Sequence, residues 1–107
     1  MCFEVSVLDV VELKPSEPMG KRRAVIIETE GWALMGCELI DSPDSPVGFK
    51  TAFPGTIDTS QIVSVLGKLS KEQVLGGLVG TIAADQRGLW DAAIESYMMQ
   101  QPVKIYP

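Results

Sequence analysis

Residues 23–29, Arg-Ala-Val-Ile-Ile-Glu-Thr, form the clearest β-strand in this chain of 107 residues. Three consecutive β-branched residues, 25–27, stand at its centre, and β-branched side chains favour the extended backbone of a sheet. The centre is apolar without interruption. Further strands are expected on both sides of this stretch along the chain.

Before it, Phe3, Val5 and Val7 alternate with polar residues, and residues 9–13 continue the alternation in a shifted register. This pattern predicts one or two strands with a bulge or bend near Leu8. Residues 14–20 are rich in turn-forming residues and are expected to form a loop.

After it, Glu30-Gly31 predicts a turn, and residues 32–40 and 47–53 predict two more strands. Prolines in residues 41–46 indicate a loop between these two strands. Residues 62–66 fit either a strand or part of a helix that runs to Leu69. Short strands packed into residues 3–66 are typical of a small barrel.

The second half of the chain predicts helix over residues 70–100. Ser70 and Gln73 have the spacing of a capping box, which marks a helix start. Asp85-Gln86 and Gly88 favour a kink or break. Residues 103–106 are expected to be a tail or a short edge strand.

Small residues recur at four-residue spacing in this segment, at Gly76, Gly80, Ala84 and Gly88. In one helix they would share a face and allow another backbone to approach closely. That face is expected to dock onto the first half of the chain or onto a second subunit. Together with an apolar stripe and an adaptable helix end, it predicts a homodimer. The predicted interface residues are Gly76, Gly80, Ala84, Trp90, Tyr97 and Met98.

The composition fits a single globular domain, residues 1–107. A net charge of −5 makes nucleic acid an unlikely partner. The sequence shows neither a signal-peptide pattern nor a membrane-spanning run, so a cytoplasmic protein without membrane contact is expected. Cys2 and Cys37 are expected to be free thiols, with Cys37 in the core.

The chain has no histidine. This excludes Ser-His and Cys-His nucleophile chemistry and most zinc sites, and no cofactor or metal is predicted. Any catalysis would depend on Arg, Lys, Asp, Glu, Tyr or Thr.

Two charged groups are candidate binding residues. Lys21, Arg22 and Arg23 could contact phosphate, or could be a solvated turn before the strand. The acidic residues that follow could form a face for a small cationic ligand or a basic protein partner, or a solvated surface that favours solubility. They are Glu28, Glu30, Glu38, Asp41 and Asp44.

Two motifs resemble a known family. GKRRAVII, residues 20–27, resembles the GxRPAVVV strand of MazF/PemK-type toxins, and TIDTSQIVSVLGKLSKEQV, residues 56–74, resembles their "rtIDksrl…lGkLseeel" segment. The resemblance implies an SH3-like barrel with C-terminal helices, as in the related CcdB toxins, and a homodimer. MazF-type members cut RNA, and CcdB poisons gyrase.

By position Arg22 matches the catalytic arginine of that family, and a base such as Glu38, Asp41 or Glu17 would have to lie near it. This chain departs from the family at Arg23, which replaces a proline, and only Ser42 is near the place of the expected hydroxyl.

The sequence therefore predicts an α+β domain, a small antiparallel SH3-like β-barrel followed by a long or broken C-terminal helix. No catalytic constellation is visible, which favours a non-enzymatic binding or interaction module that self-associates. The alternatives are a MazF/CcdB-like toxin or degenerate relative, and a binder of small cationic ligands.

Overall fold

The computed structural model describes residues 2–16 and 20–106 and has an α+β fold. Its strands are mostly antiparallel, and its two helices are short. The strands are β1 (Phe3–Val5), β2 (Asp9–Ser16), β3 (Gly20–Glu28), β4 (Met35–Asp41), β5 (Phe49–Thr51), β6 (Gly55–Thr56), β7 (Ile62–Lys68) and β8 (Val103–Ile105). The helices are α1 (Lys71–Gly77) and α2 (Arg87–Tyr97), with single 3₁₀ turns at Thr59–Gln61 and Ala84–Gln86.

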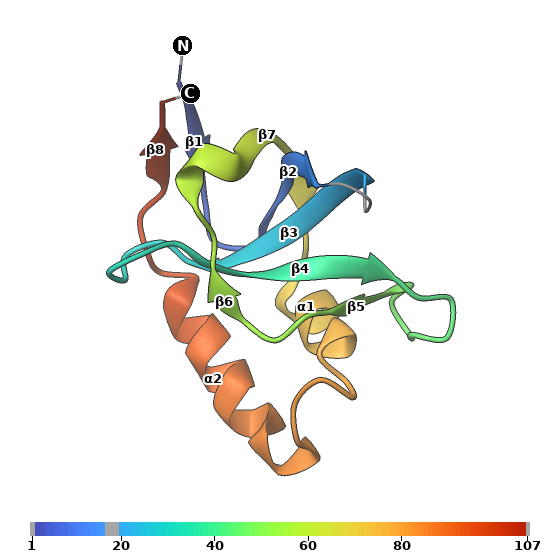
Figure 1. Ribbon diagram of the computed structural model, residues 1–107. Coiled ribbons are helices and arrows are strands. Elements are labelled where there is room, and N and C mark those ends of the chain that lie inside the picture. The colour runs from blue at the N-terminus through green and yellow to red at the C-terminus, as the bar shows by residue number, and fades with distance from the viewer. Residues whose placement is uncertain (1, 17–19, 107) are drawn as a thin grey trace.

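The main sheet has the order β5-β4-β3-β2-β7, and β6 pairs with β4. Strands β2 to β5 follow one another as an antiparallel meander, and β7 then returns to pair with β2. The first and last strands, β1 and β8, form a separate antiparallel pair, which brings the chain termini together (Figure 1). Both helices lie on one side of the main sheet and the β1–β8 pair on the other (Figure 1).

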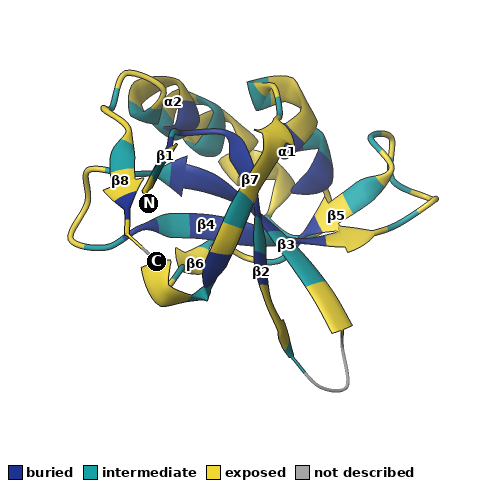
Figure 2. Cartoon of the chain, turned by 90° about the horizontal axis from the view of Figure 1, so that it is seen from above, coloured by how far each residue is buried: buried dark blue, intermediate teal, exposed yellow. Residues whose placement is uncertain are grey.

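Strand β3 lies in the middle of the sheet, and its residues 24–27 are buried on both faces. Val25 and Ile27 belong to the apolar cluster on the helix side, while Ala24 and Ile26 belong to the cluster on the opposite side. Alternate side chains of a strand point to opposite faces, so a strand covered on both sides must be apolar at every position. This explains the uninterrupted apolar centre of residues 23–29. Figure 2 shows buried residues along β2, β3 and β4.

The helix-side cluster is completed by Val74, Leu75 and Leu78 and by Ile94 of α2. The opposite cluster is completed by the paired terminal strands, which contribute Val5 and Ile105. The core therefore consists of two apolar layers with the sheet between them.

Several predicted strands are confirmed. The chain bends at Leu8, whose φ of 75° is rare for a residue with a side chain, and β1 and β2 lie on either side of the bend. Two open alternatives are resolved in favour of strand: residues 62–66, which fitted a strand or a helix, belong to β7, and residues 103–105, which fitted a tail or an edge strand, form β8.

Other strand boundaries were wrong. Strand β2 continues to Ser16 and β3 begins at Gly20, so both ends of the predicted loop are strand. Residues 17–19, with Glu17 among them, lie outside the described residues. Strand β4 begins at Met35 instead of Trp32, and β5 covers only Phe49–Thr51.

The helical half is broken, one of the two predicted forms, but neither part is long. Helix α1 begins with the predicted capping box, in which the Ser70 Oγ accepts from the Gln73 N–H and the Gln73 side chain accepts from the Ser70 N–H. It ends at Gly77, and Gly80 then adopts a φ of 85° that a helix cannot contain.

The predicted ridge of small residues was therefore wrong, because Gly76, Gly80, Ala84 and Gly88 lie in four different segments instead of on one helix face. Among the three glycines of the predicted ridge, Gly76 at the end of α1 is closely approached by another part of the described chain, whereas Gly80 and Gly88 are not. A methyl group at Gly76 would lie 2.8 Å from Val47 Cγ1, and one at Gly77 would lie 2.6 Å from Phe49 Cε2. These glycines let α1 pack against β5 and the loop before it.

Candidate functional site

Two of the three basic residues of β3, Arg22 and Arg23, are each paired with a carboxylate from β4. The Arg22 Nη2 lies 2.6 Å from Glu38 Oε1, and the Arg22 Nε donates to the same oxygen at 2.8 Å. The Arg23 Nη2 donates to Asp41 Oδ1 at 2.7 Å. Because neighbouring side chains of a strand point to opposite faces, the two pairs lie on opposite faces of the sheet.

The β3–β4 register produces these pairs. Ala24 is opposite Glu38, so Arg22 lies two positions along β3 from the residue that faces Glu38. Arg23 is opposite Leu39, which lies two positions along β4 from Asp41. Such diagonal neighbours are within reach of long side chains. An anion could bind either guanidinium only in competition with a carboxylate already in place, which weakens the basic cluster as a phosphate site.

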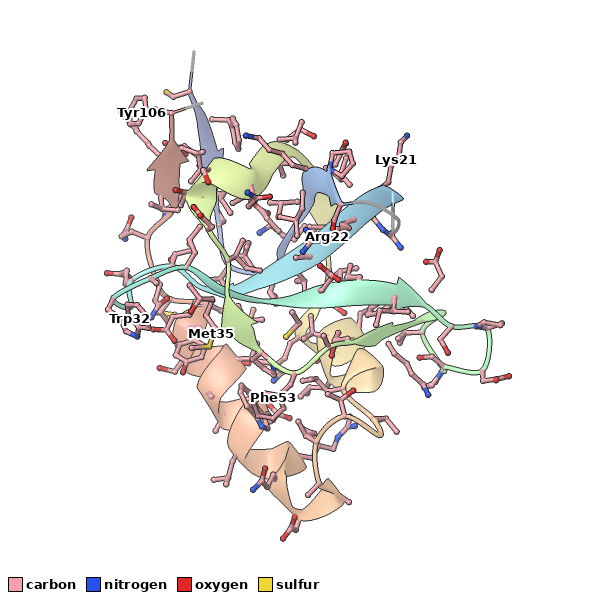
Figure 3. All side chains as sticks on the ribbon, in the orientation of Figure 1. Lys21, Arg22, Trp32, Met35, Phe53 and Tyr106 are labelled. Atoms are coloured by element: carbon pink, nitrogen blue, oxygen red, sulfur yellow. The ribbon has the colours of Figure 1, made fainter. Side chains whose placement is uncertain are left out.

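Lys21 has no ion pair within the described part of the chain and points outward at the end of β3 (Figure 3). It lines an open groove that contains both basic and acidic side chains. The residues lining this groove are Glu12, Lys21, Arg22, Arg23, Asp41 and Leu66.

The candidate acidic residues do not gather on one face. Glu38 and Asp41 are paired with arginines, and Asp44 lies in the loop before β5. Glu28 and Glu30 lie at the opposite end of β3, where the Glu30 Oε2 accepts from the Gln101 N–H at 2.8 Å. This distribution does not provide the single acidic surface that a cationic ligand would need.

Glu28 lies beside Tyr97 of α2. Burial, together with the negative charge and hydrogen bond of Glu28, raises the pKa of the Tyr97 phenol. In the core, burial raises the pKa of the Cys37 thiol to about 12. A thiol with so high a pKa is a poor nucleophile at neutral pH, so Cys37 has a packing role.

Of the predicted interface residues on α2, Trp90 and Tyr97 pack against the helix-side cluster of their own chain. The Trp90 ring also makes an edge-to-face contact with Phe53, with ring centroids 6.1 Å apart. Met98 is 45% exposed. The apolar stripe of α2 is thus mostly occupied by its own sheet.

Trp32 is not part of the core. It lies at the tip of the β3–β4 loop with 92% of its surface exposed (Figure 3). The Gln100 Oε1 accepts from the backbone N–H groups of Thr29 and Glu30, at 2.8 and 3.1 Å, and fixes the base of this loop.

No protein-family model, curated protein or solved structure matches this chain. Function must therefore be argued from the geometry of the chain itself.

The apolar surface of β7 is a feature that sequence reasoning missed. Val63, Val65 and Leu66 are 46%, 38% and 52% exposed, and among the described strands β7 pairs with β2 alone. The sequence left residues 62–66 open between strand and helix, and only the sheet order reveals that they form an edge.

The described ranges, 2–16 and 20–106, contain no group of three metal-ligating side chains. In the same ranges, no helix has the length and apolar character to cross a membrane.

Proposed function

We propose that this protein is a non-enzymatic interaction module that self-associates through the outer edge of β7. The observation that carries this proposal is a seven-residue strand at the end of the sheet with Val63, Val65 and Leu66 exposed. An edge strand presents unpaired N–H and C=O groups that can pair with a strand from another chain.

The usual protections against such pairing are weak here. Residues 62–67 of β7 contain neither a proline nor a charge. Lys68 could protect the edge, but its Nζ lies 2.9 Å from Asp9 Oδ1 and donates to the Val7 carbonyl at 3.0 Å. Two register shifts against β2 bend the strand and are the remaining protection.

A second copy of the chain is the partner that this edge fits. Two β7 strands can pair antiparallel around a two-fold axis, with Val65 near its own copy at the centre. The chain has a net charge of −5, but residues 62–67 are uncharged, so pairing of two β7 strands brings no like charges of this segment together. A strand of this length spans only about 23 Å. The contact is therefore smaller than a standard stable interface, and we expect a weak, concentration-dependent dimer.

Sedimentation equilibrium tests the proposal with two matched variants. Val65→Lys places a charge on the β7 edge, and Leu89→Lys places one on α2, where Leu89 is 71% exposed. We expect the wild type and Leu89→Lys to dimerise over tens to hundreds of micromolar and Val65→Lys to stay monomeric. If Leu89→Lys alone prevents dimerisation, the interface lies on α2. If the wild type is monomeric throughout, the proposal is wrong.

A second candidate function is favoured by one contact. The family resemblance places a catalytic arginine at Arg22 and needs a carboxylate near it, and Glu38 is hydrogen-bonded to Arg22. An endoribonuclease of the MazF type would use this pair. Purified protein would then cleave single-stranded RNA without added metal, with a loss of about 10²- to 10³-fold in rate for Arg22→Ala.

Lys104→Ala is the matched control for this assay because it removes an exposed cation on β8, away from the pair. The interaction module predicts no cleavage by any of these proteins. Cleavage that survives in Lys104→Ala and is lost in Arg22→Ala would replace the first proposal with the second.

The SH3-like barrel is part of the same proposal. It is supported by the meander from β2 to β5, by the return of β7 to β2, and by register shifts that bend the strands. A cytoplasmic location is also proposed, because the buried thiol of Cys37 is unpaired and fits a reducing compartment.

A further inference from the structure

A small apolar cavity, open to solvent along one side, lies between the end of α1 and the beginning of α2. Its volume is about 150 Å³. Leu75 and Leu78, both almost fully buried, form part of its lining together with Ile82, and Ala84 and Arg87 lie at its more exposed side. Neither the interaction surface on β7 nor the Arg22 pair involves this cavity.

The walls of the cavity are fixed by the turn that links the helices. The Ile82 N–H donates to the Leu78 carbonyl at 3.1 Å, and the Thr81 hydroxyl donates to the Thr51 carbonyl at 2.8 Å. Gly80 supplies the positive φ that reverses the chain. These contacts hold the cavity open without a ligand, as is usual for small-molecule sites.

Arg87 is the one charged residue among those that line the cavity in the described structure. It is the first residue of α2, where a positive charge opposes the helix dipole. Within residues 2–16 and 20–106 it forms no ion pair, even though Asp85 is only two positions away. A bound carboxylate would pair with this exposed guanidinium and match its planar geometry.

We propose that this cavity binds a small aliphatic carboxylate, with the hydrocarbon chain against Leu75, Leu78 and Ile82 and the carboxylate on Arg87. An apolar cavity of this volume can hold benzene, so a chain of about five carbons has a suitable size. The proposal is independent of self-association through β7.

Pentanoate, pentanol and pentylammonium are the probes that test it. Each is titrated into the isotope-labelled protein, and the amide chemical shifts of residues 75–87 are followed. We expect pentanoate to bind with a Kd on the order of 1 mM, which is reasonable for so few atoms. Pentanol should bind about tenfold more weakly because it lacks the charge-assisted hydrogen bond, and pentylammonium should be weaker still.

Three variants locate the site. Arg87→Gln should weaken pentanoate binding about tenfold and leave pentanol unchanged. Ala84→Leu, at an exposed position of the rim, should reduce the cavity and weaken both ligands. Lys104→Gln removes a distant exposed cation and should change neither.

The proposal is overturned if pentanoate and pentanol bind equally to the wild type, or if Arg87→Gln binds pentanoate as the wild type does. It is also overturned if Lys104→Gln loses as much affinity as Arg87→Gln, or if pentanoate at tens of millimolar moves no amide of this segment. The spectrum of each variant reports its folding in the same experiment.

Discussion

At the scale of single residues, Gly80 and Gly88 show how the same residue type serves different purposes. Within the described structure, nothing lies within 4 Å of the place that a side-chain methyl would occupy at either position. Gly80 has a φ of 85°, in the left-handed region, whereas Gly88 lies in the regular helix α2. Available space alone would therefore predict that an alanine substitution has the same effect on stability at both positions. The backbone conformations predict opposite effects.

Gly80→Ala should lower the free energy of unfolding by about 1 kcal/mol, because a residue with a side chain is strained at that φ. Gly88→Ala should raise it by about 0.5–1 kcal/mol, since alanine is the better helix former. Urea unfolding of the two variants and the wild type measures both changes. A Gly80→Ala protein at least as stable as the wild type would contradict this explanation of the turn.

The raised pKa of the buried Cys37 thiol should make the folded protein less stable at alkaline pH. This thiol has a pKa of about 12 in the folded protein against 9.0 for an unperturbed cysteine. Above pH 9 the unfolded chain therefore releases a proton that the folded chain retains, and stability falls until the pH passes 12. From pH 8 to pH 10 the wild type should lose about 1 kcal/mol more than Cys37→Ala.

The comparison with Cys37→Ala isolates this contribution from Tyr97, whose raised pKa acts in the same direction. Urea unfolding at several pH values provides the measurement. Parallel stability curves for the two proteins would show that the thiol is not protected by burial.

At the scale of elements, α1 depends on its first turn. It has only seven residues, too few to be stable alone, and its capping box satisfies backbone N–H groups that would otherwise be unpaired. Ser70→Ala should lower the free energy of unfolding by about 1 kcal/mol. Ser96→Ala, at an exposed position within α2, is the control and should change it by less than about 0.5 kcal/mol. Equal effects in urea unfolding would mean that the cap has no special role.

The elements that sequence predicted well are those whose signals are local. The apolar run of β3, the bend at Leu8 and the capping box at Ser70 each depend on neighbouring residues, and all are present. The position at which the helical region breaks was harder to predict, because helical apolar spacing continues through Leu78 and Ile82. A glycine at position 80 is compatible with a helix or with a positive φ, and only the packing of the turn decides between them.

The candidate sites were less predictable because they depend on distant residues. Arg22 and Glu38 are 16 positions apart, and their contact follows from the β3–β4 register. A shift of that register by one residue would direct Glu38 to the other face of the sheet. The cavity beside Arg87 depends likewise on the Thr81–Thr51 hydrogen bond, which no local pattern predicts.

At the scale of the whole molecule, the two apolar clusters share the central strands. Val25 and Ile27 face the helices, while Ala24 and Ile26 face the paired terminal strands. Loss of order in β3 would therefore disrupt both layers at once. This arrangement predicts that the domain unfolds as one cooperative unit although its two layers share no side chains.

Ile105→Ala tests this cooperativity from the far end of the chain. Ile105 is 3% exposed on β8, opposite Phe3 of β1, and belongs to the cluster that faces away from the helices. Its truncation should cost about 2–4 kcal/mol through lost burial and a new cavity. If the sheet couples the layers, Trp90 fluorescence on the helix side and far-ultraviolet circular dichroism should both shift to the same lower urea midpoint.

Trp32→Phe should be introduced in all proteins compared, because exposed Trp32 would add a signal that does not report on packing. A Trp90 transition that keeps its original midpoint while circular dichroism shifts would show that the terminal strands unfold separately from the helix side.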